Sequence, residues 1–547
     1  MKKGILTLLL GVFLASGLSA QTSPKRYFVL LADKANSPFS VNKPEQFLSR
    51  RAIERRQKQN IPVTERDLPV NPAYLSAIRQ AGAMVWFPSR WANGVLIQAD
   101  EATLAKVRAL PFVKGLERDR ALANARTAYT VSPSAAVTNP SARKLGETEG
   151  PLSYGLSATQ ITQLGVDKMH QQGFRGEGML VCILDAGFRN ANTVPYLQHL
   201  FQENRIVGTY DFVQKESSVY EDDSHGLAVL SVMAGYSESQ LIGPAYKASY
   251  LLLRTEDASG ETPVEEANWL FGAEYADSTG ADVLNSSLGY TTFEDAALNH
   301  TYNDLNGKTS LATRAANWAS EAGMLVVVSA GNEGAGRWKY VSVPADSPQV
   351  LAIGAVNAAG NRASFSSVGP TADNRIKPDL AAMGLGTVLG SPGGSITTGN
   401  GTSFASPLVA ALAAGFWQAF PRLTAKQVAE SLRRSGSQYG TPDNSLGFGI
   451  PDFGRAAAFA SDSFSLVVFP NPFTDNDRLT VLWNEVSTTE AMDVTLTNER
   501  GQILMRQRYP ADRLANLSLT PLSLSPGLYY LTLKSEKNQR TVKILKH

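Results

Sequence analysis

The chain has 547 residues, of which 43% are hydrophobic, and a net charge of +2, so it is long enough for three or four domains with sizeable cores. The low net charge excludes a global field that would attract nucleic acid or an anionic membrane, and no nucleic-acid partner is expected. The only cysteine, Cys182, excludes an internal disulfide, and its apolar neighbours on both sides favour a core position over a nucleophilic one.

The first 20 residues have the pattern of a secretory signal peptide. Lys2 and Lys3 precede an apolar run over residues 5–15, and the small residue Ala20 suits cleavage directly after it. The run is too short to span a bilayer well, and no later segment resembles a membrane helix. We therefore expect export without stable membrane insertion.

Residues 26–118 are predicted to form a small α/β sandwich in the order strand, helix, strand, strand, helix, strand. The expected helix over residues 44–59 carries a basic cluster. Because Glu54 interrupts this cluster and the chain has no global charge, we interpret it as a solvated helix face, with binding of acidic partners as the alternative. The cluster consists of Arg50, Arg51, Arg55, Arg56 and Lys58.

Residues 119–150 have the composition of a linker. Ala, Ser, Thr, Asn and Pro dominate, and large apolar residues are few. Linkers of this kind are preferred sites of proteolysis. Arg120, Arg126, Arg143 and Lys144 are candidate cleavage sites, and nothing in the sequence chooses among them.

Residues 151–460 alternate short apolar runs with helical patterns, as at 227–233 and 311–322. Apolar strands without alternation, separated by helices, predict a parallel sheet covered on both faces. In such sheets, functional sites form beyond the carboxyl ends of the strands. The expected strands lie at residues 179–184, 248–253, 282–285, 324–329 and 350–356.

Residues 461–547 form a separate all-β unit, predicted to be a sandwich. Turn residues such as those at 471–472 and 526–527 separate its strands. The expected strands lie at residues 465–469, 479–483, 493–497, 528–533 and 541–545.

Four polar residues of the 151–460 segment lie at strand ends or at the starts of the helices that follow. Asp185 ends a buried strand, where an isolated charge needs a partner. His225 precedes an apolar helix and is placed to act as a general base. Asn332 follows another strand and can donate to an oxyanion. Ser403 starts a helix, where free N–H groups and the helix dipole favour a developing oxyanion.

Taken singly, each of these residues also has a structural interpretation. Asp185 can be a cap or turn residue, His225 a structural histidine, Asn332 a turn residue, and Ser403 the cap of a buried helix. Their joint occurrence in this order, with glycine neighbours, favours a catalytic set.

The motifs around these residues resemble a known family. Residues 184–187 (Leu-Asp-Ala-Gly), 224–226 (Ser-His-Gly) and 401–407 (Gly-Thr-Ser-Phe-Ala-Ser-Pro) resemble the catalytic blocks of subtilisin-like serine peptidases, the subtilases. Residues 329–334 (Ser-Ala-Gly-Asn-Glu-Gly) resemble their oxyanion block. The resemblance covers about residues 155–460 and implies an α/β fold, a subtilisin-like parallel sheet with helices on both faces.

The resemblance also implies a role for each residue. Asp185 would orient the imidazole, His225 would be the base, Ser403 the nucleophile, and Asn332 with the Ser403 N–H the oxyanion hole. An α/β-hydrolase, which also uses a serine nucleophile, would need a catalytic histidine after the serine, and the only later histidine is His547.

Ser287, Leu288 and Gly289 resemble the segment that pairs with the substrate backbone as an added strand and walls the primary specificity pocket. Arg189 stands near where many members of the family carry an acidic calcium ligand. No metal-binding residue is therefore assigned; no cofactor is required, and calcium stays open as a structural ion. Glu333 either favours basic substrates or faces solvent, so the cleavage specificity is not predicted.

Both flanking units resemble accessory domains of exported proteases. Residues 21–118 resemble the subtilase prodomain, a folding assistant and inhibitor removed on activation. Residues 469–473 (Phe-Pro-Asn-Pro-Phe), 526–531 (Pro-Gly-Leu-Tyr-Tyr-Leu) and 543–546 (Lys-Ile-Leu-Lys) resemble a type-A sorting domain of the type IX secretion system. This implies a Gram-negative bacterium of the Bacteroidota, export across its outer membrane, and the secretion machinery as a partner. A generic β-sandwich domain is the alternative.

The sequence therefore predicts a secreted serine endopeptidase, made as a zymogen, that hydrolyses proteins or peptides through an acyl-enzyme. The alternative is a catalytically inactive subtilase fold used for binding or adhesion. The expected organisation is a signal peptide (1–20), prodomain (21–118), linker (119–150), catalytic domain (151–460) and sorting domain (461–547).

Overall fold

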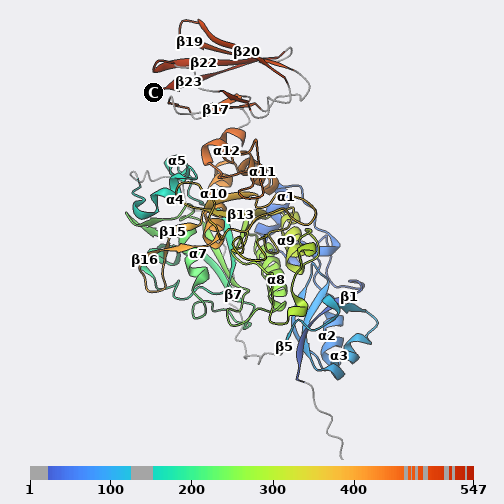
Figure 1. Cartoon of the computed structure of the whole chain (residues 1–547). Coiled ribbons are helices and arrows are strands. Elements are labelled where there is room, and N and C mark those ends of the chain that lie inside the picture. The colour runs from blue at the N-terminus through green and yellow to red at the C-terminus, as the bar shows by residue number, and fades with distance from the viewer. Residues whose placement is uncertain are drawn as a thin grey trace, which may run out of the picture.

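The structure is a computed structural model of the chain. It describes residues 23–124, 152–460, 466–469, 471–474, 479–483, 491–510, 517–519, 524–535 and 539–547. The predicted signal peptide and most of the predicted linker lie outside the described residues. Figure 1 shows three folded parts: an N-terminal unit in blue, a large central domain, and a C-terminal β-sandwich in red. The domain boundaries themselves stay predictions.

The N-terminal unit is an antiparallel sheet with helices, in the predicted order. The sheet has the strand order β2-β3-β1-β4, and β5 pairs with β1 at residues 25 and 26. The elements are β1 (Lys25–Leu31), α1 (Arg50–Lys58), α2 (Pro72–Gln80), β2 (Met84–Ser89), β3 (Gly94–Ala99), α3 (Glu101–Arg108), β4 (Val113–Leu116) and β5 (Ala123–Asn124).

The central domain is built on a seven-stranded parallel sheet, which confirms the predicted fold class. The strand order is β14-β13-β12-β11-β6-β10-β7. The strands are β6 (Leu180–Asp185), β7 (Ile206–Asp211), β10 (Ser249–Arg254), β11 (Val283–Ser286), β12 (Leu325–Ser329), β13 (Leu351–Val356) and β14 (Leu380–Met383).

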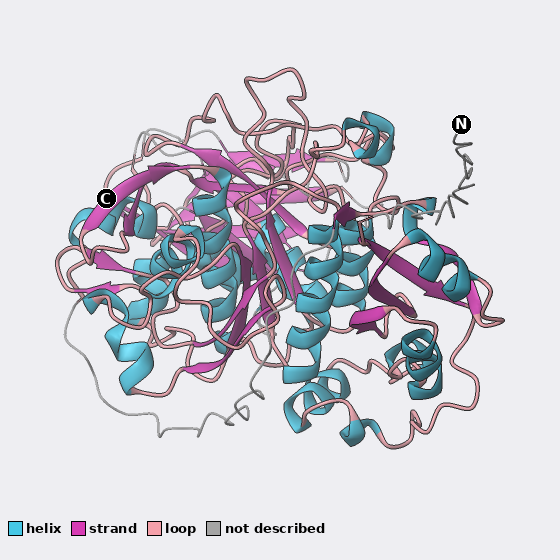
Figure 2. Ribbon diagram, turned by 90° about the horizontal axis from the view of Figure 1, so that it is seen from below, coloured by secondary structure: helices cyan, strands magenta, loops and turns pink. Residues whose placement is uncertain are grey.

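Helices cover both faces of this sheet, as Figure 2 shows. On one face, β6 directs Val181 and Ile183 into a core shared with α7 (His225–Ala234) and α10 (Thr402–Ala419). On the other face, Cys182 and its neighbours pack with α8 (Val264–Thr279) and α9 (Leu311–Glu321). Because both faces are buried, the strands are continuously apolar. Cys182 is a buried core residue, as expected.

Smaller elements complete the central domain. The short helices α4 (Ala158–Thr162), α5 (Val166–Gln171) and α6 (Gln198–Gln202) precede α7, and α11 (Ala425–Arg434) and α12 (Phe453–Ala460) follow α10. Two antiparallel hairpins pair β8 (Tyr236–Ser237) with β9 (Leu241–Ile242) and β15 (Leu385–Gly390) with β16 (Ile396–Asn400). Across the described residues, we find no helix that is both long and apolar enough to cross a membrane.

The N-terminal unit packs on α8, and this contact corrects the interpretation of the basic cluster. Arg55 and Arg56 are 4% and 3% exposed, and both donate hydrogen bonds to the buried carboxylate of Asp277 on α8, as does Arg90. The prediction of a solvated face is wrong for Arg55 and Arg56. Both are buried against the central domain, where their carboxylate partner lies. Arg50 stays exposed, with a side chain that is 89% accessible.

The C-terminal unit is a sandwich of two antiparallel sheets, as predicted. Asn471, within the Phe-Pro-Asn-Pro-Phe motif, hydrogen-bonds the last strand through both its amide nitrogen and its oxygen. The neighbouring Phe473 is buried in the sandwich core. The strands are β17 (Leu466–Phe469), β18 (Leu479–Trp483), β19 (Met492–Asn498), β20 (Ile503–Tyr509), β21 (Leu517–Leu519), β22 (Gly527–Lys534) and β23 (Gln539–Lys546).

Candidate active site

The structure pairs a buried Asp185 with a partly exposed His225. Asp185 is the last residue of β6, and His225 is the first residue of α7. His225 Nδ1 lies 2.7 Å from Asp185 Oδ1, which also accepts the Ala186 N–H at 2.8 Å. Asp185 is fully buried, whereas about a third (32%) of the His225 side chain is exposed. The carboxylate therefore fixes one ring nitrogen and leaves the other facing an accessible space.

This carboxylate also sets the proton affinity of the imidazole. Burial acts to lower the pKa of His225, but the charge of Asp185 and its hydrogen bond, with a further contribution from Asp223, raise the pKa above its ordinary value of 6.5. The Asp223 side chain also accepts the His225 backbone N–H at 2.7 Å, which fixes the start of α7.

Ser403 lies in the first turn of α10, next to a residue that contacts the histidine. The ring of Phe404 lies 5.8 Å from the His225 ring, centroid to centroid. The hydroxyl of Ser403 donates to the Ser287 carbonyl oxygen at 3.3 Å, and among the described residues it has no hydrogen bond to His225. A serine hydroxyl rotates freely, and catalytic hydrogen bonds are often absent or long before substrate binds.

Two N–H donors lie close to Gly401. A Cβ built on Gly401 would lie 3.6 Å from the Ser403 backbone nitrogen and 3.8 Å from Asn332 Nδ2. Asn332 Oδ1 accepts the Thr402 N–H at 2.9 Å, which orients the amide so that Nδ2 faces outward. The Ser403 N–H is one of the first-turn donors that an α-helix leaves without an internal partner. The geometry offers an anion two donors at a helix N-terminus.

The predicted substrate segment lies beside the serine. The Ser287 hydroxyl donates to the Ser403 carbonyl oxygen at 2.9 Å, and the two residues are thereby bonded in both directions. Leu288 is buried, whereas Gly289 is exposed. Tyr290 then pairs with Val343 in an antiparallel bridge. An exposed glycine backbone next to the serine suits the addition of a substrate strand.

Sequence reasoning missed the residues that hold these parts together. Ser406 donates to Asn285 at 2.8 Å, and Asn285 donates to Ser287 at 3.1 Å, which ties α10 to β11. Thr402 orients Asn332. Ser406 and Thr402 lie within the serine motif, and this position could have marked them as part of the site. Nothing in the sequence indicates that Ser406 pairs with Asn285.

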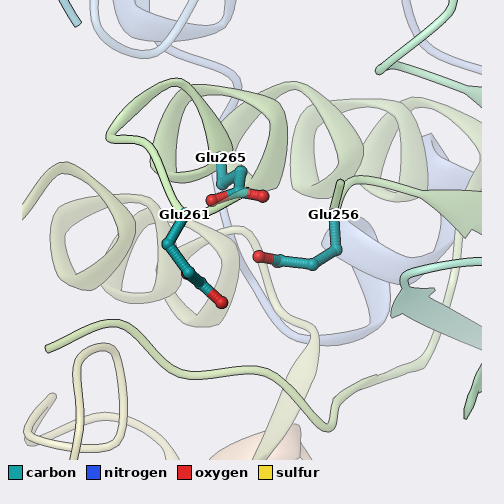
Figure 3. Close-up of side chains that lie close together, drawn as sticks. All are labelled: Glu256, Glu261 and Glu265. Atoms are coloured by element: carbon teal, nitrogen blue, oxygen red, sulfur yellow. The ribbon is translucent and has the colours of Figure 1, made fainter. Parts of the chain in front are cut away.

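One group of carboxylates in the described residues has the spacing of a metal site. Figure 3 shows Glu256, Glu261 and Glu265, one oxygen of each lying within 4.8 Å of the others. Both oxygens of Glu265 already accept backbone N–H groups, at 3.0 and 2.9 Å. Burial and Glu265 raise the pKa of Glu256 well above its ordinary value, so a protonated Glu256 can share its proton with Glu265. Glu256 and Glu265 therefore have partners other than an ion, and a structural calcium ion stays a prediction.

Comparison with known proteins assigns all three folded parts. Residues 176–449, half of the chain, match the family described as "Subtilase family". The chain belongs to the subtilase family. The N-terminal part of this subtilase, residues 26–133, matches the "Peptidase S8 propeptide domain, Bacteroidota", and residues 467–547 match the "Secretion system C-terminal sorting domain". The predicted family, propeptide and sorting domain are thereby confirmed.

Individual relatives are similar over about half of this subtilase. Subtilisin NAT of Bacillus subtilis subsp. natto is 32% identical over 284 residues, which are 51% of this chain and 66% of that protein. Subtilisin of Bacillus pumilus is 31% identical over 285 residues, 51% of this chain and 92% of that protein. The crystal structure of MycP1 with its N-terminal propeptide removed aligns with a TM-score of 0.43 and 23% identity, over 55% of this chain and 96% of that one.

Proposed function

We propose that this subtilase is a secreted serine endopeptidase, made as a zymogen, that hydrolyses peptide bonds through Ser403, His225 and Asp185. The Asp185–His225 pair at 2.7 Å carries this proposal, because it presents an oriented imidazole beside a serine in the first turn of a helix. A fully buried carboxylate is costly unless it is paired, and His225 is the titratable partner of Asp185.

The chemistry is acyl transfer. His225 accepts the Ser403 proton through its free ring nitrogen as the hydroxyl oxygen attacks the peptide carbonyl carbon. His225 then gives this proton to the leaving amine as the carbon–nitrogen bond breaks. Water, deprotonated by the same imidazole, hydrolyses the acyl-enzyme and regenerates the serine. Asp185 stays ionised and stabilises the imidazolium that forms in each step.

The tetrahedral intermediate carries a negative oxygen that needs preorganised donors. Asn332 Nδ2 and the Ser403 N–H lie close to Gly401, and they are proposed to supply two such donors. Their orientation costs nothing during the reaction, because the hydrogen bond from Thr402 to Asn332 is already made.

The flanking domains support a secreted zymogen. The propeptide domain contacts the catalytic domain through buried ion pairs on α8, and its removal would require cleavage of the chain between the two domains. The sorting domain indicates export across the outer membrane by the type IX secretion system, with the protein either released or attached to the surface. Proteins or peptides are the proposed substrates.

A fluorophosphonate probe, which reacts with activated serines, tests the proposal on the secreted protein. Intact-mass measurement should find one probe molecule per chain for the wild type and for Ser395→Ala, a control at an exposed serine, and none for Ser403→Ala. The labelled species should lack the propeptide domain. A correctly processed wild type that neither labels nor hydrolyses casein would contradict the proposal and favour a catalytically inactive binding protein.

A further inference from the structure

Arg254 is a buried cation at the carboxyl edge of the sheet, on the strand next to the one that presents Asp185. It ends β10, and its neighbours in register are Asp185 at the end of β6 and Asp211 at the end of β7. The residue is 5% exposed. A buried guanidinium is costly unless carboxylates and hydrogen-bond acceptors surround it, so its surroundings indicate what it is held for.

The guanidinium bonds to both loops that carry the proposed Asp and His. Its Nε donates to the Ala186 carbonyl oxygen at 3.1 Å, and the N–H of Ala186 itself donates to Asp185. Its Nη1 lies 2.8 Å from Asp222, three residues before His225. Arg254 therefore links the peptide that follows the catalytic carboxylate to the segment that leads into the catalytic histidine.

These two loops are in close contact, so each loop restricts the position of the other. A Cβ on Gly187 would lie 2.6 Å from the Asp223 nitrogen, and a Cβ on Gly226 would lie 2.5 Å from the Gly187 oxygen. Neither position accepts a side chain without displacement of the other loop. Backbone hydrogen bonds join the two loops, from the N–H groups of residues 188, 189 and 190 to the carbonyl oxygens of residues 219, 223 and 220, at 2.8–3.0 Å. Arg254 adds a buried side-chain link to these bonds.

The anchor of this connection lies on the neighbouring strand. Arg254 Nη1 donates to Asp211 Oδ2 at 2.7 Å, while Asp211 Oδ1 accepts two backbone N–H groups at 2.6 and 2.8 Å. Asp257 lies at the limit of the ion-pair range, 4.0 Å away. Three carboxylates thus face one guanidinium, and the planar fork of arginine can bind several acceptors at fixed angles where the point charge of lysine cannot.

From this geometry we infer that Arg254 is a positioning residue for the hydrolytic reaction: together with the backbone hydrogen bonds, it fixes the Asp185 loop against the His225 loop and thereby aligns the imidazole. The inference rests on the proposed function. Because misplacement of a catalytic group by about 1 Å can cost on the order of 100-fold in rate, a loss of this link should lower turnover without a change in substrate binding.

Arg254→Lys is the main test, made in the full chain and measured after processing. Active sites are titrated with the fluorophosphonate probe, so that kcat refers to active molecules only. We expect kcat to fall by about 10- to 100-fold with KM unchanged. The acid limb of the pH–kcat/KM profile should also move to lower pH, because a misaligned Asp185 stabilises the imidazolium less.

Arg433→Lys is the matched control. Arg433 also bridges a carboxylate, Asp379 at 2.9 Å, and a backbone carbonyl, that of Val350 at 3.3 Å, but it touches neither catalytic loop. The Arg433→Lys variant should have a kcat within about twofold of the wild-type value and an unchanged acid limb, even if both variants lower the melting temperature. Arg254→Lys with wild-type kcat and acid limb, or with changes no larger than those of Arg433→Lys, would overturn the inference.

Asp222→Asn keeps the inference testable if Arg254→Lys does not fold. It preserves the shape of the side chain and removes the charge that Arg254 binds, so kcat and the acid limb should change in the same directions by smaller amounts. An unchanged kcat and pH profile in Asp222→Asn would contradict the link. A wild type without Ser403-dependent hydrolysis would overturn the proposed function together with this inference, whereas an active wild type with insensitive Arg254 and Asp222 variants would overturn the inference alone.

Discussion

Two fully buried aspartates of this subtilase have opposite surroundings. Both oxygens of Asp277, at the interface with the propeptide domain, accept hydrogen bonds from guanidinium groups, which three arginines provide. Asp185, at the candidate active site, has one titratable partner, His225, and its Oδ2 has no hydrogen-bond partner in the described part of the chain. Burial is the same in both places, and the partners differ.

The difference distinguishes Asp277, a carboxylate that joins two domains, from Asp185, a carboxylate proposed to take part in catalysis. Burial acts to raise the pKa of Asp277, but the three arginines outweigh it and hold the pKa below its ordinary value of 3.8. Arginine is always charged, so that network has no proton to move. Asp185 is paired with an imidazole whose protonation can change near neutral pH. Saturation by permanent cations therefore suits a carboxylate that joins two domains, and pairing with a titratable group suits the catalytic role proposed for Asp185.

The largest expected effect comes from removal of the Asp185 charge. Asp185→Asn should lower kcat on the order of 10,000-fold, because an amide can hold the wrong imidazole tautomer and does not stabilise the imidazolium. Turnover per processed molecule, with peptide substrate and intact-mass quantification, measures this. Asp277→Asn is the control, since it replaces an equally buried aspartate that contacts the propeptide domain. Comparable losses of turnover in the two variants would break the comparison.

Asn332 is a neutral group that can be compared with the two aspartates, because only the oxygen of its amide has hydrogen-bond partners. Its Oδ1 is bonded to Thr402, while Nδ2 has no hydrogen-bond partner among the residues that the structure describes. Asn332→Ala should lower kcat by about 100- to 1,000-fold with little change in KM, because this donor acts on the oxyanion of the transition state. Glu333→Gln, at the next exposed position, should leave kcat unchanged. Full activity in Asn332→Ala would remove this amide from the mechanism.

The Asp277 network should govern retention of the propeptide domain after cleavage. Asp277→Asn leaves three arginines without their common anion, a change that costs about 2–5 kcal/mol when such a pair is buried. The cleaved propeptide domain of the wild type should co-purify with the catalytic domain above pH 3.8, where Asp277 is ionised, and that of Asp277→Asn should dissociate.

Arg50→Ala is the control for this prediction. Arg50 lies on the same helix α1, but its ion pair with Glu54 is exposed and is worth about 0–1 kcal/mol. Size-exclusion chromatography of the processed protein, followed by mass analysis of each fraction, compares the variants. Equal retention of the propeptide domain in Asp277→Asn and Arg50→Ala would show that the aromatic contacts of the interface, such as Phe87 on Phe271, suffice.

Much of the candidate active site could be predicted from sequence, because each residue stands in a local pattern. Asp185 ends an apolar run, His225 precedes one, and Ser403 stands in the first turn of a helix, directly after a glycine-rich segment. Parallel topology then brings these strand ends to one edge. Contacts between distant segments could not be predicted in this way: Ser406 and Asn285 are 121 residues apart, and no periodicity pairs them.

The parts of the fold that sequence patterns missed are explained by their surroundings. The helix α8 carries carboxylates such as Glu274 and Asp277, which in the sequence have the pattern of a solvent-exposed helix face. In the structure they are buried because the propeptide domain packs on them. The interpretation of Arg55 and Arg56 was wrong for the same reason. Strand β7 contains Gly208 and polar residues because it lies at the edge of the sheet.

The smallest expected effect concerns the pH dependence of catalysis. Only the neutral imidazole of His225 accepts the Ser403 proton, so activity should be lost as pH falls through the raised pKa of His225. The acid limb of kcat/KM, measured with substrate well below KM, should therefore lie above pH 6.5. An acid limb below 6.5 would mean that Asp185 does not govern the imidazole.

Asp223 offers a fine adjustment of this limb. Asp223→Asn keeps the oxygen that accepts the His225 backbone N–H, so the start of α7 should be preserved, but it removes a negative charge that helps to raise the pKa. The acid limb should move to lower pH, and by less than in a variant that removes the charge of Asp185, because Asp223 contributes less to the raised pKa of His225. Asp373→Asn, which alters an exposed pair with Arg375, should leave the limb in place. Because the shift depends on charge and not on packing, 1 M salt should reduce it, and a shift that persists unchanged in salt would point to a displaced loop.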